Sequence, residues 1–105
     1  MPTKGYQDLV VWQRALMLTE STYRVSEKLP RRQLYGLSSQ MRRAAVAIPA
    51  NIAEGQGRKT RGAFLNHLSI ARGSLHELET HVILAARLEF IPLQDQELLL
   101  VQAAE

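Results

Sequence analysis

Residues 37–58 read LSSQMRRAAVAIPANIAEGQGR and carry the clearest periodicity in the chain. Apolar residues recur at spacings of four, four, three and four, at Leu37, Met41, Ala45, Ile48 and Ile52. This spacing puts one apolar stripe on a helix and predicts a helix over residues 37–54. Pro49 lies inside it, and a proline there leaves the Ala45 carbonyl without its usual partner. Because Ile52 keeps the register, we expect a kink at Pro49 rather than an end.

The flanking segments predict two further helices. Upstream, residues 7–28 form one, with Asp8 as N-cap or first-turn acid and an apolar stripe at Leu9, Trp12, Leu16 and Tyr23. Downstream, Gly55-Gln56-Gly57 is expected to end the helix of residues 37–54, with Gly55 or Gly57 as a left-handed cap. Thr60 is a good N-cap for a helix over 61–89, whose stripe is Phe64, Leu68, Ala71, Leu75, Leu78, Val82, Ala85 and Leu88.

A fourth helix is expected from Leu93, after the turn Phe90-Ile91-Pro92, with Asp95 and Glu97 in its first turn. Short connections favour antiparallel neighbours. The prediction is an all-α, antiparallel up-down-up-down four-helix bundle in one domain, residues 1–105. The fourth helix would cover about half of the third, so it is short or truncated, or another subunit covers the remainder.

Composition excludes several classes of protein. The 105 residues are 46% hydrophobic and 22% charged, which is typical of a globular domain. Cysteine is absent, which excludes disulfides and thiolate metal sites. No run of 18 apolar residues suggests a membrane span, and no apolar signal core is seen, so a cytoplasmic location is expected.

Charge is distributed unevenly along the chain. Residues 31–72 carry eight basic side chains and one acid, Glu54, whereas residues 73–105 carry six acids and Arg87. Such asymmetry suggests either a polyanionic partner or one copy docking on another. We interpret the basic residues as a band that binds RNA or DNA phosphates without reading sequence, at Arg42, Arg43, Arg58, Lys59 and Arg61. Exposed aromatic candidates for stacking are few: Tyr6, Tyr35 and Phe90.

No catalytic or metal-binding pattern is found. His67, His76 and His81 have no shared ligand spacing, and Glu77–His81 supplies only half of a metal pair. We therefore predict no enzyme, no cofactor and no metal. Near Pro49, Asn51 or Glu54 is expected to be partly buried and to bond the kinked backbone, Ser74 or an arginine such as Arg43 or Arg72. A functional pocket beside the kink is the alternative.

Three segments carry a resemblance: residues 39–58, the stretch Asp8-Leu9-Val10-Val11-Trp12-Gln13, and residues 70–79, IARGSLHELE. Together they resemble the four helix bundle protein family, also called the 23S rRNA intervening-sequence protein family. The resemblance implies a left-handed bundle that assembles into a ring-like homopentamer. It also implies distant kinship to a basic pentamer that binds nucleic acid and a reverse transcriptase.

Apolar residues outside the main stripes point independently to self-assembly, at Leu65, Ile70, Ile83, Leu84, Val10, Val11, Leu18 and Val25. The expected function is a non-enzymatic, self-assembling scaffold or adaptor that binds RNA or DNA. The alternative is a protein–protein interaction module whose charges serve homo-oligomer assembly. No membrane partner and no small-molecule substrate are expected.

Overall fold

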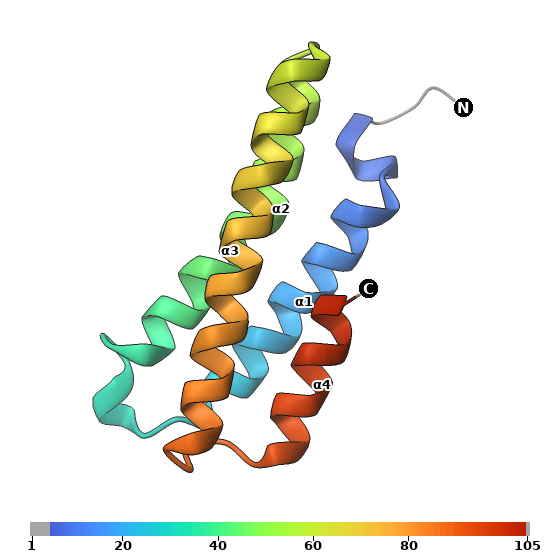
Figure 1. Cartoon of the computed structure of the whole chain (residues 1–105). Helices are drawn as coiled ribbons and strands as arrows, with labels where there is room; N and C mark the ends of the chain where they lie inside the picture. Colours follow the sequence, from blue (N-terminus) through green and yellow to red (C-terminus); the bar gives the residue numbers. More distant parts are fainter. Residues whose placement is uncertain (1–4, 105) are drawn as a thin grey trace.

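The structure, a computed structural model, describes residues 5–104. Its four α-helices are α1 (Val10–Ser26), α2 (Leu37–Gly57), α3 (Arg61–Arg87) and α4 (Leu93–Ala104). Two short 3-10 helices, η1 (Gly5–Asp8) and η2 (Arg31–Gln33), precede α1 and α2, and residues 5–104 contain no strand. Figure 1 shows successive helices running in opposite directions. The predicted four-helix bundle with a short fourth helix is confirmed.

The α2–α3 hairpin is the longest part of the molecule, which measures 45 × 24 × 21 Å. α2 packs against both α1 and α3, and α4 contacts α3 and α1. α4 has 12 residues against 27 in α3, so it covers only part of α3, near the end where the two helices connect (Figure 1). An ion pair of 2.7 Å between Lys28 Nζ and Asp95 Oδ2 joins the end of α1 to the first turn of α4.

The core follows the predicted stripes of α2 and α3. All five predicted α2 residues are buried, with Met41 and Ala45 at 0% exposure. In α3, Ala71, Leu78, Val82 and Ala85 are buried, and Phe64, Leu68 and Leu75 are half-buried. Leu88 was predicted to be in the stripe and is 50% exposed, because it caps the end of α3 rather than lying within its core face.

The predicted core face of α1 is wrong in part. Leu9 and Trp12 do pack against the core, but Leu16 and Tyr23 are exposed, and the buried residues of this helix are Ala15, Leu18, Thr19, Thr22, Val25 and Ser26. Three of these are polar, and their hydroxyls donate to carbonyls of the same helix, so they can be buried without a lost hydrogen bond. Hydropathy alone therefore assigns the wrong side of α1 to the core. Leu18 and Val25 were predicted to lie outside the core and to support self-assembly, but both are buried core residues.

The helix ends correct two further predictions. α1 begins at Val10 after Leu9, whose side chain forms no cap, so Asp8 lies in η1 and does not cap α1. α2 continues past Glu54 to Gly57, and the left-handed residue of the turn is Lys59, with φ 63°, instead of Gly55 or Gly57. The Thr60 cap is confirmed, since Thr60 Oγ1 accepts from the Ala63 amide at 3.2 Å.

Gly55 serves the contact between α2 and α3. A Cβ added at Gly55 would lie 2.7 Å from His67 Cβ, whereas one added at Gly57 meets nothing within 4 Å. The α2 backbone therefore approaches α3 more closely than any side chain at position 55 would allow.

Gly55→Ala and Gly57→Ala test this reading, because alanine favours a helix equally at both positions. We expect Gly55→Ala to lower the free energy of unfolding by about 1–3 kcal/mol through overpacking. Gly57→Ala is expected to leave it unchanged or to raise it slightly. Urea denaturation of both variants measures the difference, and equal stabilities would contradict the role given to Gly55.

The prediction that α2 continues past Pro49 is confirmed. The Ala45 carbonyl, which Pro49 leaves without an amide partner, accepts a hydrogen bond from another helix. Thr19 Oγ1 of α1 lies 3.0 Å from the Ala45 oxygen and 2.8 Å from the Ala15 oxygen. Ala45 is fully buried, so water cannot take the place of that hydroxyl. The hydroxyl has one hydrogen, which these two acceptors share. The Ala15 carbonyl also has its helical amide partner and the Ala45 carbonyl does not, so Thr19 compensates the hydrogen bond that Pro49 removes and ties α1 to the middle of α2.

Candidate nucleic-acid interface

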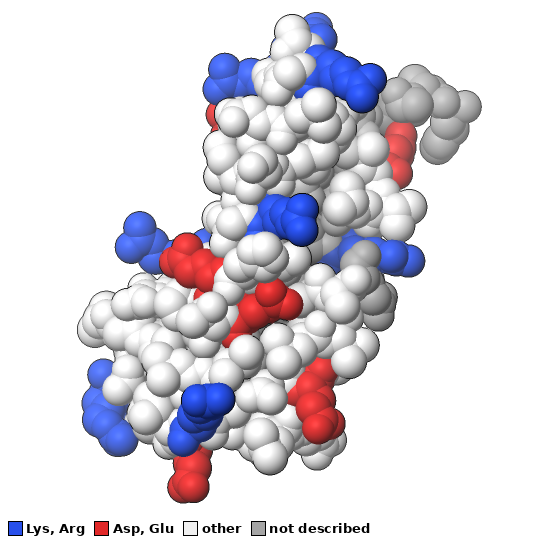
Figure 2. Space-filling view, viewed as in Figure 1, with Lys and Arg blue, Asp and Glu red and all other residues white. Residues whose placement is uncertain are grey.

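The five basic residues predicted to bind phosphate fall into two groups. Arg42 and Arg43 lie in the first half of α2, whereas Arg58, Lys59 and Arg61 form a turn cluster where α2 connects to α3, with Arg61 as the first residue of α3. Fifteen residues of helix separate Arg43 from Arg58, which is about 22 Å. Figure 2 shows basic side chains gathered at the tip of the α2–α3 hairpin, with basic and acidic groups interspersed over the rest of that face. The charges on this face form separate patches and no unbroken band.

Within the turn cluster, Arg58 is partly neutralised. Its Nη2 donates to Glu54 Oε1 at 2.8 Å, and both side chains are more than half exposed. Lys59 and Arg61 are exposed, and neither has a carboxylate within ion-pair distance among residues 5–104. Two of the three charges at this turn are therefore fully available to an anion.

The neighbouring positive charges change the pKa of Glu54. The hydrogen bond from Arg58, with a further contribution from the charge of His67, lowers the pKa of the Glu54 carboxyl below its ordinary value of 4.5. A lowered folded-state pKa means that this pair contributes stability above pH 4.5, and that the contribution is lost as the pH falls through the folded-state pKa. Because the Glu54 side chain is more than half exposed, solvent screens the pair and its effect on stability is small.

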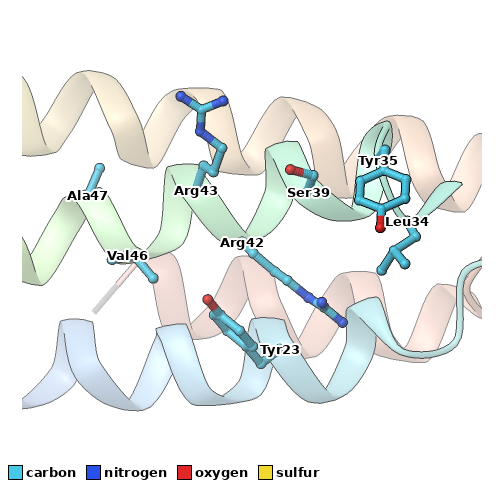
Figure 3. A pocket seen from close by; sticks show the side chains of 8 residues that line it. All are labelled: Tyr23, Leu34, Tyr35, Ser39, Arg42, Arg43, Val46 and Ala47. Carbon is cyan, nitrogen blue, oxygen red and sulfur yellow. The ribbon is translucent and has the colours of Figure 1, made fainter.

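Arg42 and Arg43 are neighbours in sequence but diverge in space. Arg42 is half-buried, its Nε donates to Ser26 Oγ at 2.8 Å, and its guanidinium lies 5.2 Å from the centre of the Tyr23 ring. Arg43 is exposed and points to another side of α2 (Figure 3). It shares a surface hollow with Glu77 of α3 but is not within ion-pair distance of it. Adjacent positions on a helix do not face each other, so the two side chains diverge, although both residues border one hollow beside α1.

Asn51 has the structural role that was predicted, and Glu54 does not. Asn51 is half-buried, its Nδ2 donates to the Ala47 carbonyl at 2.8 Å, and its Oδ1 lies 3.2 Å from Nδ1 of His67. It therefore bonds the backbone near Pro49 and joins α2 to α3. The prediction allowed either residue to take this role, and Asn51 takes it. Glu54 lies one turn further along, at the exposed turn, where its partner is Arg58.

The other two histidines lie on α3, and His81 has one acidic side chain near it. His81 Nε2 approaches Glu77 Oε1 to 3.5 Å but forms no hydrogen bond with it. Within residues 5–104 no group of three or more His, Asp or Glu side chains is arranged to hold a metal ion.

Sequence reasoning missed Tyr23. Its apolar spacing assigned it to the core stripe of α1, yet the ring is 42% exposed beside Arg42. The available signal was the spacing of Thr19, Thr22 and Ser26, which forms a small-residue face of its own. If the face with Thr19, Thr22 and Ser26 is assigned to the core, Tyr23 lies on the solvent-exposed side of α1.

These observations define a class of protein, an all-helical four-helix bundle with exposed basic side chains, of which Arg43, Lys59 and Arg61 have no carboxylate within ion-pair distance among residues 5–104. The chain belongs to the 23S rRNA-intervening sequence protein family, whose model matches residues 7–105. The description of this family names no catalytic activity. A search of curated proteins gives no match. Among the described helices, none combines the length and apolar character needed to cross a membrane.

Proposed function

We propose that this chain is a non-enzymatic, self-assembling scaffold of the cytoplasm that binds the phosphate backbone of RNA or DNA. The observation that carries the proposal is the unpaired state of Arg43, Lys59 and Arg61 within residues 5–104. Exposed cations without carboxylate partners lose little when they exchange water and small ions for phosphates. Arg42 and Arg58 add two charges, each already held in place by a neighbour.

The distance between the two groups suits a duplex. About 22 Å along α2 corresponds to roughly six base-pair steps of a nucleic-acid helix. The separation exceeds two Debye lengths at 0.1 M salt, so the groups contribute independently to binding. A ring of copies would repeat both groups around its rim. The number five for such a ring rests on the family resemblance.

Support for self-assembly comes from apolar side chains that the fold leaves outside. Large apolar residues with more than a third of their surface exposed occur on α1, α3 and α4, at Val10, Val11, Met17, Leu65, Ile70, Ile83, Leu84, Leu93, Leu98 and Val101. A hollow of about 310 Å³ also lies between α1, α2 and α3, beside the last described turn of α4, and is lined in part by Val11, Ile48 and Leu75. Apolar surface of this extent on a small domain is typical of subunit interfaces.

The test is binding of labelled structured RNA and of duplex DNA over a salt series, with the solution mass measured on the same samples. We expect an oligomer whose affinity falls linearly in log salt. No binding to either probe at low salt would refute the nucleic-acid part of the proposal. A monomeric mass at every protein concentration would refute the scaffold part.

The same apolar exposure favours a second candidate function, a protein-interaction module. In that case the basic residues of α2 and the acidic residues of α3 and α4 would meet between subunits. Neutralising Arg43, Lys59 and Arg61 would then dissociate the oligomer, whereas a phosphate-binding role leaves the oligomer intact.

Glu54→Gln gives a gain-of-function test of the turn cluster. The change removes the carboxylate that pairs with Arg58 and leaves a third free cation at the turn. We expect a several-fold higher affinity for duplex DNA at 0.1 M salt, with a slope of log affinity against log salt steeper by up to about 0.9. Glu97→Gln, which makes the same charge change on α4, is the control. Equal gains in both variants would show that only net charge matters.

A further inference from the structure

The largest hollow beside the predicted basic residues combines aromatic rings with a guanidinium. It lies where α1, α2 and the connection between them meet, has a volume of about 590 Å³, and is lined among others by Tyr23, Leu34, Tyr35, Arg42, Arg43 and Val46. In Figure 3, Arg42 extends from α2 across the hollow, with the Tyr23 ring on one side and Leu34 and Tyr35 on the other. We call this site the tyrosine–arginine hollow.

Tyr35 is the most exposed large hydrophobic side chain of the described residues, at 93%. It lies in the turn between η2 and α2 and has no aromatic partner among residues 5–104. Tyr6 and Phe90, the other two aromatic candidates, are half-buried, with Tyr6 against Trp12 and Phe90 beneath Arg32. An aromatic ring left this free in water gains the most from a ligand that stacks on it.

Arg42 is fixed in position before any ligand arrives. Its Nε donates to the buried Ser26, its guanidinium lies 5.2 Å from the centre of the Tyr23 ring, and its two terminal nitrogens form no hydrogen bond within residues 5–104. A guanidinium held in this way loses little freedom when it binds an oxyanion. No carboxylate lines the hollow, so its electrostatic complement is an anion.

We propose that the tyrosine–arginine hollow binds an unpaired nucleotide of single-stranded RNA or DNA. The base stacks on Tyr35, and its adjacent phosphate contacts the terminal nitrogens of Arg42. A duplex does not meet this chemistry, because its bases are already stacked and paired. The inference rests on the proposed function and extends it. The chain would bind backbone at Arg43 and the turn cluster, and would prefer unpaired strands at this site.

The experiment compares three probes of equal length at equal salt: an oligothymidine strand, the same strand with abasic positions in place of its bases, and a thymidine–adenosine duplex. The abasic strand keeps every phosphate and removes the stacking partner. We expect the oligothymidine strand to bind roughly 5- to 150-fold more tightly than the abasic strand, the range for one base stacked on an aromatic side chain.

Tyr35→Leu keeps the apolar bulk and removes the ring, and the exposure of Tyr35 makes a folding defect unexpected. We expect this variant to lose the preference for oligothymidine, with unchanged binding to the abasic strand and the duplex, and Tyr35→Phe to keep the preference. Phe90→Leu is the matched control, since Phe90 also pairs with an arginine, at 5.7 Å, but lies outside the hollow.

The outcomes separate the two proposals. If wild type binds the duplex but treats oligothymidine and the abasic strand alike, the hollow is not a base site and the backbone proposal stands. The same conclusion follows if Tyr35→Leu and Phe90→Leu have equal effects. If no probe binds at low salt, both proposals fail together.

Discussion

Thr19→Val should lower the free energy of unfolding by about 1–3 kcal/mol, although the two side chains have nearly the same shape. The change removes a hydroxyl that lies 3.0 Å from the fully buried Ala45 carbonyl. Pro49 has no amide hydrogen to bond that carbonyl, so the variant leaves a buried acceptor without a partner. Chemical denaturation followed by circular dichroism measures the loss.

Thr22→Val is the matched control on the same helix. The Thr22 hydroxyl donates to the Leu18 carbonyl, which keeps its ordinary helical hydrogen bond when the hydroxyl is removed. We expect a change below about 1 kcal/mol, because no buried acceptor is left unpaired.

A double-mutant cycle with Pro49→Ala isolates the cause. Alanine at position 49 supplies the amide hydrogen that the Ala45 carbonyl lacks, so Thr19→Val should then cost less than about 1 kcal/mol. If the cost of Thr19→Val is the same with proline and with alanine at position 49, Thr19 does not compensate the proline.

The combined variant Arg43→Gln, Lys59→Gln and Arg61→Gln should weaken duplex binding by two to three powers of ten at 0.1 M salt. Each phosphate contact contributes about 0.9 to the slope of log affinity against log salt, so three lost contacts flatten the slope by about 2.7. Glutamine is chosen because it is polar, uncharged and compatible with a helix. Lys59 has a positive φ, and a change to another long side chain leaves that backbone cost similar.

A charge-matched variant controls for net charge. Arg24→Gln, Arg31→Gln and Arg87→Gln remove three exposed cations that lie outside the proposed interface. We expect less than a tenfold loss of affinity, because only the general attraction is reduced. Equal losses in the two triple variants would mean that nucleic acid binds by diffuse attraction and has no defined interface.

Much of the fold could be predicted because most helices here have ordinary signals. The stripe from Leu37 to Ile52, the Thr60 cap and the turn before Leu93 each depend on neighbours within a few residues. The core face of α1 could not be predicted from hydropathy. Its buried threonines and serine satisfy their hydroxyls with helix carbonyls, so polar residues take positions that apolar ones would usually fill.

The sequence identified the basic residues of the candidate site but could not predict where their side chains lie. The sequence identifies Arg42 and Arg43 as a pair. Both line the tyrosine–arginine hollow, but helix geometry makes their side chains diverge, and of the two only Arg42 has its guanidinium near an aromatic ring. Arg58 is among the residues predicted to bind phosphate, and in the structure it pairs with Glu54, one helical turn before it.

The sequence by itself determined the number and order of the helices, the continuation of α2 past Pro49 and the uneven distribution of charge. These properties depend on residues close together along the chain, where spacing and backbone sterics decide. Only the tertiary structure decided that Gly55 admits His67, that Thr19 bonds the Ala45 carbonyl, and that Tyr23 and Tyr35 line one hollow with Arg42. The reason is that each of these contacts joins residues of different segments of the chain. How closely those residues approach depends on the packing of α1, α2 and α3, which no local sequence pattern encodes.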